Sequence, residues 1–185
     1  MSEATVTVYE KSKARRAAAV VLLAVIVIFT IAGLNRSVSH QAKKTAALFD
    51  ADFGIAEQLG ERMNAARGLA ALAAEDSAVS GEYEALRTAY NSLYDASSVH
   101  DKYTANTALE TAWQSLYTAM NGSGMDSETQ RKADYYADIL TNAQRCIEND
   151  GYNAAVAQFQ TSVMQTPVTR LLHALIFTEL PEAFA

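Results

Sequence analysis

Cysteine and proline are nearly absent from this chain of 185 residues. The single cysteine, Cys146, excludes an intramolecular disulfide and every metal site that needs several cysteines. Only two prolines occur in a chain that is half apolar and rich in alanine, which favours an all-α fold over a sheet protein with many turns. Internal repeats and low-complexity tracts are lacking too. The length therefore leaves room for one modest domain and an additional segment.

Motifs of common catalytic and metal sites are also missing. No Gly-rich loop follows a predicted strand, no serine lies in a nucleophile elbow, and no Glu-x-x-His pair occurs. Cys146 is expected to be a small buried apolar residue. Three histidines without metal-binding spacing are interpreted as surface or interface residues: His40, His100 and His173. We therefore expect no enzymatic activity, no cofactor and no metal.

The charge is unevenly distributed along the chain. From Ser37 onward there are 10 Lys and Arg against 19 Asp and Glu, a net charge of −9, whereas residues 1–36 carry five bases and two acids. Binding to nucleic acid needs clustered basic residues, so an acidic domain of this kind is not expected to bind it. Several carboxylates are expected on solvated faces or in ion pairs: Asp52, Glu57, Glu61, Glu110 and Asp134.

One long apolar run stands out, the 19 uncharged residues from Ala17 to Asn35. At about 1.5 Å per residue a helix of this length spans about 28 Å, close to the ~30 Å hydrocarbon core of a bilayer. A soluble core helix would show a polar face, and this run has none. The run therefore predicts a transmembrane helix over residues 17–35, preceded by a short basic tail over residues 1–16.

Basic residues flank the run on both sides. The prediction places five of them next to the membrane: Lys11, Lys13, Arg15, Arg16 and Arg36. Four bases precede the run and three follow it closely, which favours a cytoplasmic N-terminus and an exported domain in the cell membrane. A cleaved signal peptide is the alternative, since Ser37-Val38-Ser39 faintly resembles a cleavage site.

Beyond the membrane run, apolar residues recur at helical spacing. We expect one helix over residues 38–75 in heptad-like spacing, a second over 82–121 with a phase slip near 96–98, and a third from 126 or 127 to Pro167. Ser127 and Gln130 fit a capping box for the third helix. Pro167 is expected to end it, and a short C-terminal helix follows. The chain is therefore predicted to be all-α, with an antiparallel bundle of three long helices over residues 38–185.

Arg62 lies in the apolar register of the helix expected over residues 38–75. A charge at such a position is costly unless it is paired and hydrogen-bonded. Near the end of the third helix, helical spacing places one apolar stripe over Tyr152, Val156, Phe159 and Val163. Tyr152 and the adjacent Asn153 are hypothesised to be the partners of Arg62. The other tyrosines, together with Trp113, are interpreted as core residues whose polar atoms reach a partner.

Several residues of this chain resemble a family pattern. Tyr152, Asn153 and Val156 match the pattern YN-x-x-V, and Pro167 and Phe184 match a following proline and a terminal aromatic residue. With the membrane helix and the long-helix bundle, this pattern is similar to that of the LemA family. The family's second YN is Phe159-Gln160 here.

A second stretch extends the resemblance over about residues 45–185. The run QLGERMN is similar to the family's QL-x-x-R-x-D, through Gln58, Leu59, Arg62 and Asn64. Where the family continues with a proline and NL, only Leu69 agrees. The resemblance implies a divergent bacterial member with an antiparallel helical bundle and without a recognised catalytic centre.

Three functions are compatible with these features. The first is a non-enzymatic, membrane-tethered interaction or scaffold protein. The second is an extracytoplasmic sensor or ligand-binding domain that signals through a partner membrane protein. The third, an enzyme or metalloprotein with bundle carboxylates, is the least favoured. The expected partners are the lipid bilayer, a membrane or envelope protein, and a second copy of the chain.

Overall fold

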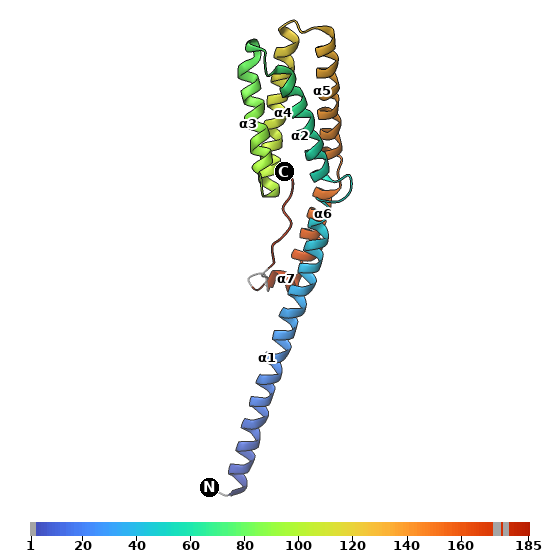
Figure 1. The fold of residues 1–185 in the computed structure, drawn as a ribbon. Helices are drawn as coiled ribbons and strands as arrows, with labels where there is room; N and C mark the ends of the chain where they lie inside the picture. Colours follow the sequence, from blue (N-terminus) through green and yellow to red (C-terminus); the bar gives the residue numbers. More distant parts are fainter. Residues whose placement is uncertain (1–2, 172–174, 176–177) are drawn as a thin grey trace. The chain divides into compact units, whose positions relative to one another are not determined.

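The computed structural model describes residues 3–171, 175 and 178–185. These residues form helices and contain no strand, so the predicted all-α class is confirmed (Figure 1). The α-helices are α1 (Glu3–Ala46), α2 (Ile55–Ala73), α3 (Ser80–Asp95), α4 (Val99–Gly122), α5 (Ser127–Glu148), α6 (Tyr152–Phe159) and α7 (Pro167–Leu171). A 3₁₀-helix covers Ser77–Val79, and a π-helical turn covers Gln160–Met164.

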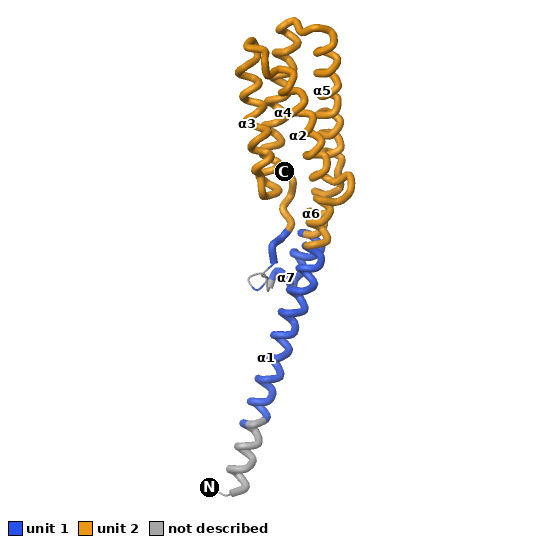
Figure 2. The backbone as a smooth tube through the Cα atoms, viewed as in Figure 1, with its two compact units in different colours: residues 1–42, 160–180 blue, residues 43–159, 181–185 orange. Residues whose placement is uncertain are grey.

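The chain divides into two compact units (Figure 2). Unit 1 comprises residues 1–42 and 160–180, and therefore contains most of α1 together with α7. Unit 2 comprises residues 43–159 and 181–185, and contains α2 to α6 together with the last five residues, which we call the C-terminal segment.

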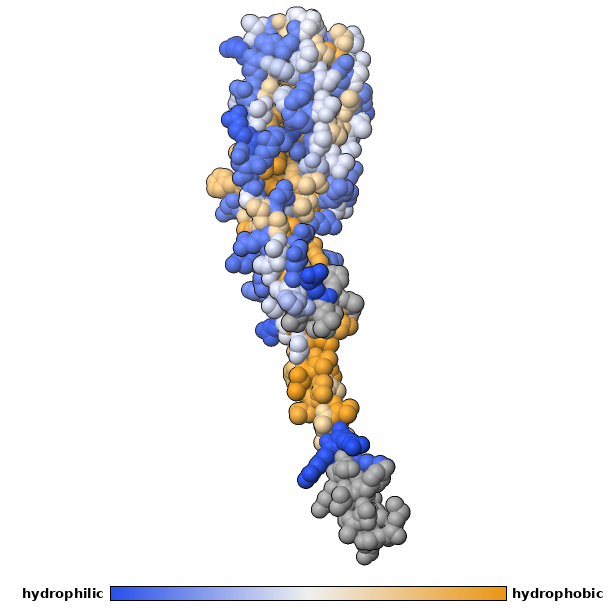
Figure 3. Space-filling model, turned by 180° about the vertical axis from the view of Figure 1, so that it is seen from behind, coloured by the Kyte–Doolittle hydropathy of each residue, from blue (hydrophilic) through white to orange (hydrophobic). Residues whose placement is uncertain are grey.

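In unit 1, α1 carries the predicted apolar run. The stretch Arg15–Ala46 is long and apolar enough to cross a membrane. Its large apolar side chains lie exposed from Val20 to Phe29, and they form a hydrophobic band in Figure 3. The Thr30 hydroxyl donates to the Ile26 carbonyl oxygen at 2.8 Å, which satisfies the polar atom within the helix. At the end of the run, the Asn35 amide donates to the Leu175 carbonyl oxygen at 2.8 Å.

In unit 2, four helices lie side by side, and successive helices run in opposite directions (Figure 1). Helix α2 packs mainly on α5 and on α3, and α3 packs on α4. Leucines from all four helices fill the core between them, and each is at most 4% exposed: Leu59, Leu69, Leu86, Leu93, Leu109, Leu116 and Leu140. Their spacing within each helix is the period-3.6 pattern seen in the sequence.

The bundle of three long helices is not what the structure shows, because each expected helix is interrupted. The first break covers residues 47–54, where Phe53 has a φ of 62° and is 80% exposed. Phe49, within the break, and Ile55, the first residue after it, are both buried. Apolar side chains of a loop and of a helix can therefore enter the same core. For this reason the apolar spacing over residues 38–75 does not reveal the break.

The second break covers residues 96–98 and the third covers residues 149–151, and a side chain caps the helix that follows each of them. Ser98 precedes α4 and accepts a hydrogen bond from the Asp101 amide at 2.9 Å, at the position of the phase slip. Asp150 accepts a 2.6 Å bond from the Tyr152 amide at the start of α6. Pro167, expected to end a helix, instead begins α7, since proline is well suited to the first helical position.

The backbone at the first break passes so close to preceding carbonyl groups that position 54 requires a glycine. A Cβ atom there would lie 2.8 Å from the Ala51 carbonyl oxygen and 2.9 Å from that of Leu48. We expect Gly54→Ala to lower the free energy of unfolding by about 1–3 kcal/mol, because backbone must shift to make room. The fluorescence of Trp113, the single tryptophan and a residue buried in unit 2, measures this in urea titrations.

Gly60 provides the matched control for this prediction. It lies within α2, and a Cβ atom there would meet nothing within 4 Å. Gly60→Ala should therefore stabilise unit 2 by up to about 1 kcal/mol through helix propensity. If both substitutions stabilise the protein equally, the tight approach at Gly54 has no energetic consequence.

Asp126, and not Ser127, caps the start of α5. Its carboxylate accepts hydrogen bonds from the Thr129 hydroxyl at 2.6 Å and from the Glu128 and Thr129 amides at 2.8 and 3.0 Å. The hydroxyl of Thr129, and then the two amides, lower the pKa of Asp126 to about 2. The carboxylate accepts all three of these bonds, and it carries a charge that is favoured at a helix N-terminus.

This cap predicts a pH dependence of stability. Because the folded pKa of Asp126 lies below its ordinary value of 3.8, the stabilisation is complete above that value and is lost as the pH falls towards about 2. We expect NMR titration of the carboxyl group to give a midpoint near 2, and Asp126→Asn to flatten the acid limb of the unfolding curve. A midpoint at 3.8 or above would contradict the cap.

Candidate functional site

Arg62 lies in the core of unit 2, and its side chain is 0% exposed. It extends from α2, one helical turn after Leu59 and one before Ala66, two buried apolar residues. Its guanidinium forms an ion pair with Glu110 of α4 and donates a hydrogen bond to the Gln144 amide oxygen of α5. One cation therefore links three of the four helices of the bundle.

Further side chains complete a polar layer around this pair. The Glu110 carboxylate, whose side chain is 28% exposed, also accepts from the Trp113 indole N–H at 2.9 Å and from the Gln114 amide. The Gln144 oxygen accepts a second bond from the Asn106 amide at 3.1 Å. The Gln144 amide donates to Glu148 at 2.9 Å. We call Arg62, Asn106, Glu110 and Gln144 the polar layer.

The electrostatics of the polar layer are those of a fixed ion pair. Burial lowers the pKa of Arg62, and the Glu110 charge and hydrogen bond oppose this shift. Arginine nevertheless stays protonated in proteins, and an ionised carboxylate only accepts hydrogen bonds. The layer therefore joins three helices through one ion pair and its hydrogen bonds. Two buried atoms, Arg62 Nε and Asn106 Oδ1, have no hydrogen-bond partner among the described residues.

The hypothesis that Tyr152 and Asn153 are the partners of Arg62 is wrong. The Tyr152 hydroxyl donates to the Glu182 carbonyl oxygen at 2.7 Å. The Asn153 side chain forms two bonds with the backbone of Phe184: its amide donates to the carbonyl oxygen at 2.9 Å, and its oxygen accepts from the N–H at 2.8 Å. Both residues begin α6, after the third break, so they meet the C-terminal segment instead of the polar layer.

Aromatic rings complete the contact of the C-terminal segment with unit 2. Phe184 is 4% exposed, and its ring lies 5.3 Å from that of Tyr103 and 6.0 Å from that of Phe49. Phe49 in turn lies edge-on to Tyr152 at 5.4 Å. Burial, and then the nearby Glu182 and Asp50 charges, raise the pKa of Tyr152. Phe49, Tyr103, Tyr152, Asn153 and Phe184 form what we call the C-terminal clamp.

The other sequence candidates lie apart from the polar layer and the clamp. His40 and His100 are exposed, and His173 lies outside the described residues. Cys146 is exposed, so its expected burial is wrong: it sits on the outer face of α5, away from the neighbouring core positions Ala143 and Ile147. Within the described residues, no group of three or more His, Cys, Asp or Glu side chains could hold a metal ion.

The carboxylates and flanking bases have varied surroundings. Glu110 is the ion-pair member described above, and Asp134 accepts from the Tyr117 hydroxyl and the Gln130 amide, each at 2.7 Å. Glu57 accepts from the Phe53 amide at 2.6 Å. Asp52 and Glu61 are exposed. The flanking bases Lys13, Arg15, Arg16 and Arg36 are exposed on α1, and the side chain of Lys11 lies outside the described residues.

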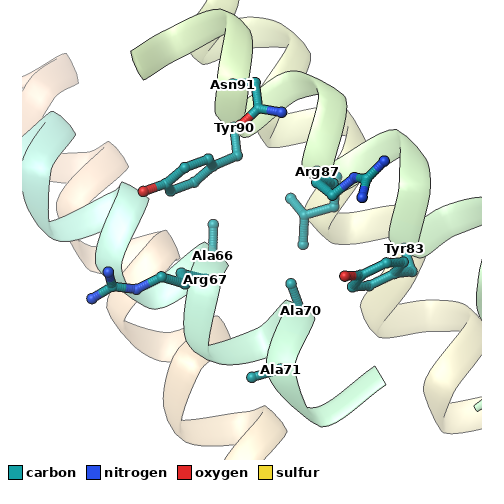
Figure 4. Close-up of a pocket in the computed structure, with 9 residues that line it drawn as sticks. Ala66, Arg67, Ala70, Ala71, Tyr83, Arg87, Tyr90 and Asn91 are labelled. Atoms are coloured by element: carbon teal, nitrogen blue, oxygen red, sulfur yellow. The ribbon is translucent and has the colours of Figure 1, made fainter. Parts of the chain in front are cut away.

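A pocket lies between α2 and α3 of unit 2, and its volume is about 290 Å³ (Figure 4). Small residues of α2 face two tyrosines of α3 across it, and a guanidinium lies at either side. The lining residues are Ala66, Arg67, Ala70, Ala71, Tyr83, Leu86, Arg87, Tyr90 and Asn91.

The sequence does not reveal the pocket, because the helical spacing of Tyr83 and Tyr90 predicts that both side chains fill the core. Both are only partly buried. A run of alanines on α2 opposite two tyrosines spaced seven residues apart on α3 is the signal that could have revealed it. That signal becomes readable only once α2 and α3 are known to pack together.

None of the family models, curated proteins or solved structures compared with the chain matches it.

Proposed function

We propose that this chain is a single-pass membrane protein whose unit 2 is a non-enzymatic interaction or scaffold domain. The observation that carries the membrane anchor is the exposure of α1. Its apolar side chains are exposed on all sides, up to 73% at Phe29, and the most apolar window is 0% buried. A helix segment that is apolar all round belongs in a hydrophobic environment, and no described residue buries this window.

Alkaline extraction of membranes tests the anchor. The full chain should stay in the membrane pellet, whereas Leu23→Arg combined with Ile26→Arg should shift it towards the soluble fraction. Each arginine near the centre of the span costs about 2.5–3.5 kcal/mol of insertion free energy. The intact mass of the protein decides between an anchor and a signal peptide, since cleavage after residue 39 would remove the span.

The scaffold part of the proposal is supported by the construction of unit 2. The polar layer joins α2, α4 and α5, and the clamp holds the C-terminal segment against the bundle. Both sets of contacts hold separate parts of unit 2 together, which supports a domain that presents a fixed surface to a partner. The clamp also joins the YN-x-x-V motif to the terminal aromatic residue, two parts of the chain on which the resemblance to the LemA family rests.

The orientation of unit 2 is part of this proposal, with the domain exported. A reporter cysteine at Ser123, in the turn that follows α4, and replacement of the exposed Cys146 by alanine allow labelling of intact cells with an impermeant thiol reagent. Labelling is the expected result. Protection in intact cells, together with labelling in permeabilised cells, would place the domain in the cytoplasm.

The partner of the scaffold is tested by cross-linking in membranes. We expect one adduct, either with a second copy of the chain or with a membrane or envelope protein. The two outcomes are separated by mass spectrometry of the adduct. A chain that stays uncross-linked and monomeric both in membranes and in detergent would contradict a scaffold function.

A sensor or ligand-binding domain that signals through a partner membrane protein is the second candidate. The observation that favours it is the pocket between α2 and α3, which combines an apolar floor with aromatic and cationic walls. Thermal shifts of the purified chain with small-molecule panels test this candidate, because a ligand that binds only the folded state raises its melting temperature.

A further inference from the structure

We propose that the pocket between α2 and α3 binds a small aromatic carboxylate. The ligand ring lies against Tyr83 and Tyr90, and the ligand carboxylate pairs with Arg67. This inference rests on the ligand-binding candidate described above and is independent of the scaffold proposal. Three features of the pocket carry it: its size, its aromatic wall and its charge.

The size of the pocket limits the ligand to a molecule with a single ring. Ala66, Ala70 and Ala71 leave space where larger residues of α2 would fill the gap to α3 (Figure 4). The volume of about 290 Å³ lies just below the ~300–1,000 Å³ typical of ligand pockets. Nucleotides and lipid tails are too large for this space, whereas a benzene ring with a short polar substituent fits it.

The wall formed by α3 favours an aromatic ligand. Tyr83 and Tyr90 are seven residues apart, which is about two helical turns, so both rings extend from one face of α3. Figure 4 shows both side chains directed into the space between the helices. Aromatic rings pair in offset-stacked or edge-to-face arrangements that contribute beyond the burial of apolar area. A planar ring against this wall would contact both tyrosines and the alanine floor.

The charge of the lining favours an anion. Two arginines line the pocket and no Asp or Glu does, although residues 37–185 carry a net charge of −9. The guanidinium of Arg87 is engaged with Glu84 at 2.7 Å. Among the described residues, Arg67 makes only a 3.4 Å hydrogen bond to Asn64, which lies beyond the usual range for such bonds. The Arg67 side chain can therefore rotate towards a ligand carboxylate and bind it through two parallel hydrogen bonds, the bidentate geometry that arginine favours.

Phenylacetate is the probe that tests this inference on the full chain in lipid nanodiscs. Benzylamine has the same ring with the opposite charge, and acetate has the carboxylate without the ring. Calorimetry gives the Kd of each, and ¹⁹F NMR of protein labelled with fluorotyrosine shows which rings respond, after assignment with Tyr83→Phe and Tyr90→Phe.

We expect saturable binding of phenylacetate, with shifts at Tyr83 and Tyr90, and much weaker binding of benzylamine and acetate. Arg67→Gln should weaken binding about tenfold or more, because a hydrogen-bonded charge is lost. Ala70→Leu should abolish binding by filling the pocket. The control Arg145→Gln, an exposed arginine on α5, should leave the Kd within about twofold.

Two kinds of result would overturn the inference. Benzylamine binding as tightly as phenylacetate would exclude a carboxylate ligand, and an unchanged Kd in Arg67→Gln would exclude the pairing with Arg67; either result would leave the ligand-binding candidate intact. No saturable binding of phenylacetate, together with no thermal shift from any panel compound, would remove both the inference and that candidate. The scaffold proposal would be unaffected in either case. Trp113 fluorescence confirms that each variant is folded.

Discussion

Glu110→Ala is expected to lower the free energy of unfolding of unit 2 by about 3–5 kcal/mol. The substitution leaves Arg62 as an unpaired charge with a side chain that is 0% exposed. The cost of burying the charge of Arg62 is then no longer offset by the ion pair. Urea unfolding followed by Trp113 fluorescence measures the loss.

Two comparisons show whether burial of the unpaired charge is the cause. Replacing both members of the pair, Arg62→Leu with Glu110→Leu, should cost far less than Glu110→Ala alone, because no charge remains in the core. Glu128→Ala removes a surface partner of Lys132, where both side chains are more than half exposed, and should cost less than about 0.5 kcal/mol. Equal effects of Glu110→Ala and Glu128→Ala would show that the core ion pair behaves like a surface pair.

Phe184→Ala is expected to cost about 3–5 kcal/mol, the second large effect. Phe184 is 4% exposed and contacts the rings of Phe49 and Tyr103, so truncation leaves a cavity in the C-terminal clamp. The C-terminal segment should also be held less firmly against unit 2, since the ring contacts are lost. Trp113 fluorescence in urea measures the stability. Hydrogen exchange of the backbone amide at position 184 reports detachment of the segment, because it should be faster in Phe184→Ala than in the unchanged chain.

Phe53 is the matched control, because it is an aromatic residue of unit 2 that is 80% exposed. Phe53→Ala should change the stability by less than about 0.5 kcal/mol. Asn153→Ala should cost about 1–3 kcal/mol, and less when Phe184 is already replaced by alanine, because both residues hold the same segment. Strict additivity of the two substitutions would mean that the clamp does not act as one unit.

The local features of the fold follow closely from the sequence. The apolar run from Ala17 to Asn35 lies within one helix, and the stripe Tyr152, Val156, Phe159 and Val163 is buried throughout. Such patterns are readable because helical periodicity and apolar run length depend on neighbours within a few residues. The phase slip near residues 96–98 likewise lies at the connection between α3 and α4.

The helix boundaries follow from the sequence less well. Residues 38–75 keep an apolar spacing compatible with one helix, yet the chain breaks over residues 47–54. The break depends on Gly54, where a Cβ atom would meet carbonyl oxygens of the preceding turn, and on the left-handed backbone at Phe53. Periodicity records which residues are buried, and a loop can bury its apolar side chains as a helix does.

The sequence by itself determined the all-α class, the apolar span of α1 and the unusual position of Arg62 in an apolar register. The tertiary structure alone decided what Arg62, Tyr152 and Asn153 contact. Arg62 meets Glu110 and Gln144, which lie 48 and 82 residues further along the chain, and Asn153 meets a segment 31 residues away. Period and composition are set by local interactions, whereas these contacts depend on which helix faces meet when the bundle closes.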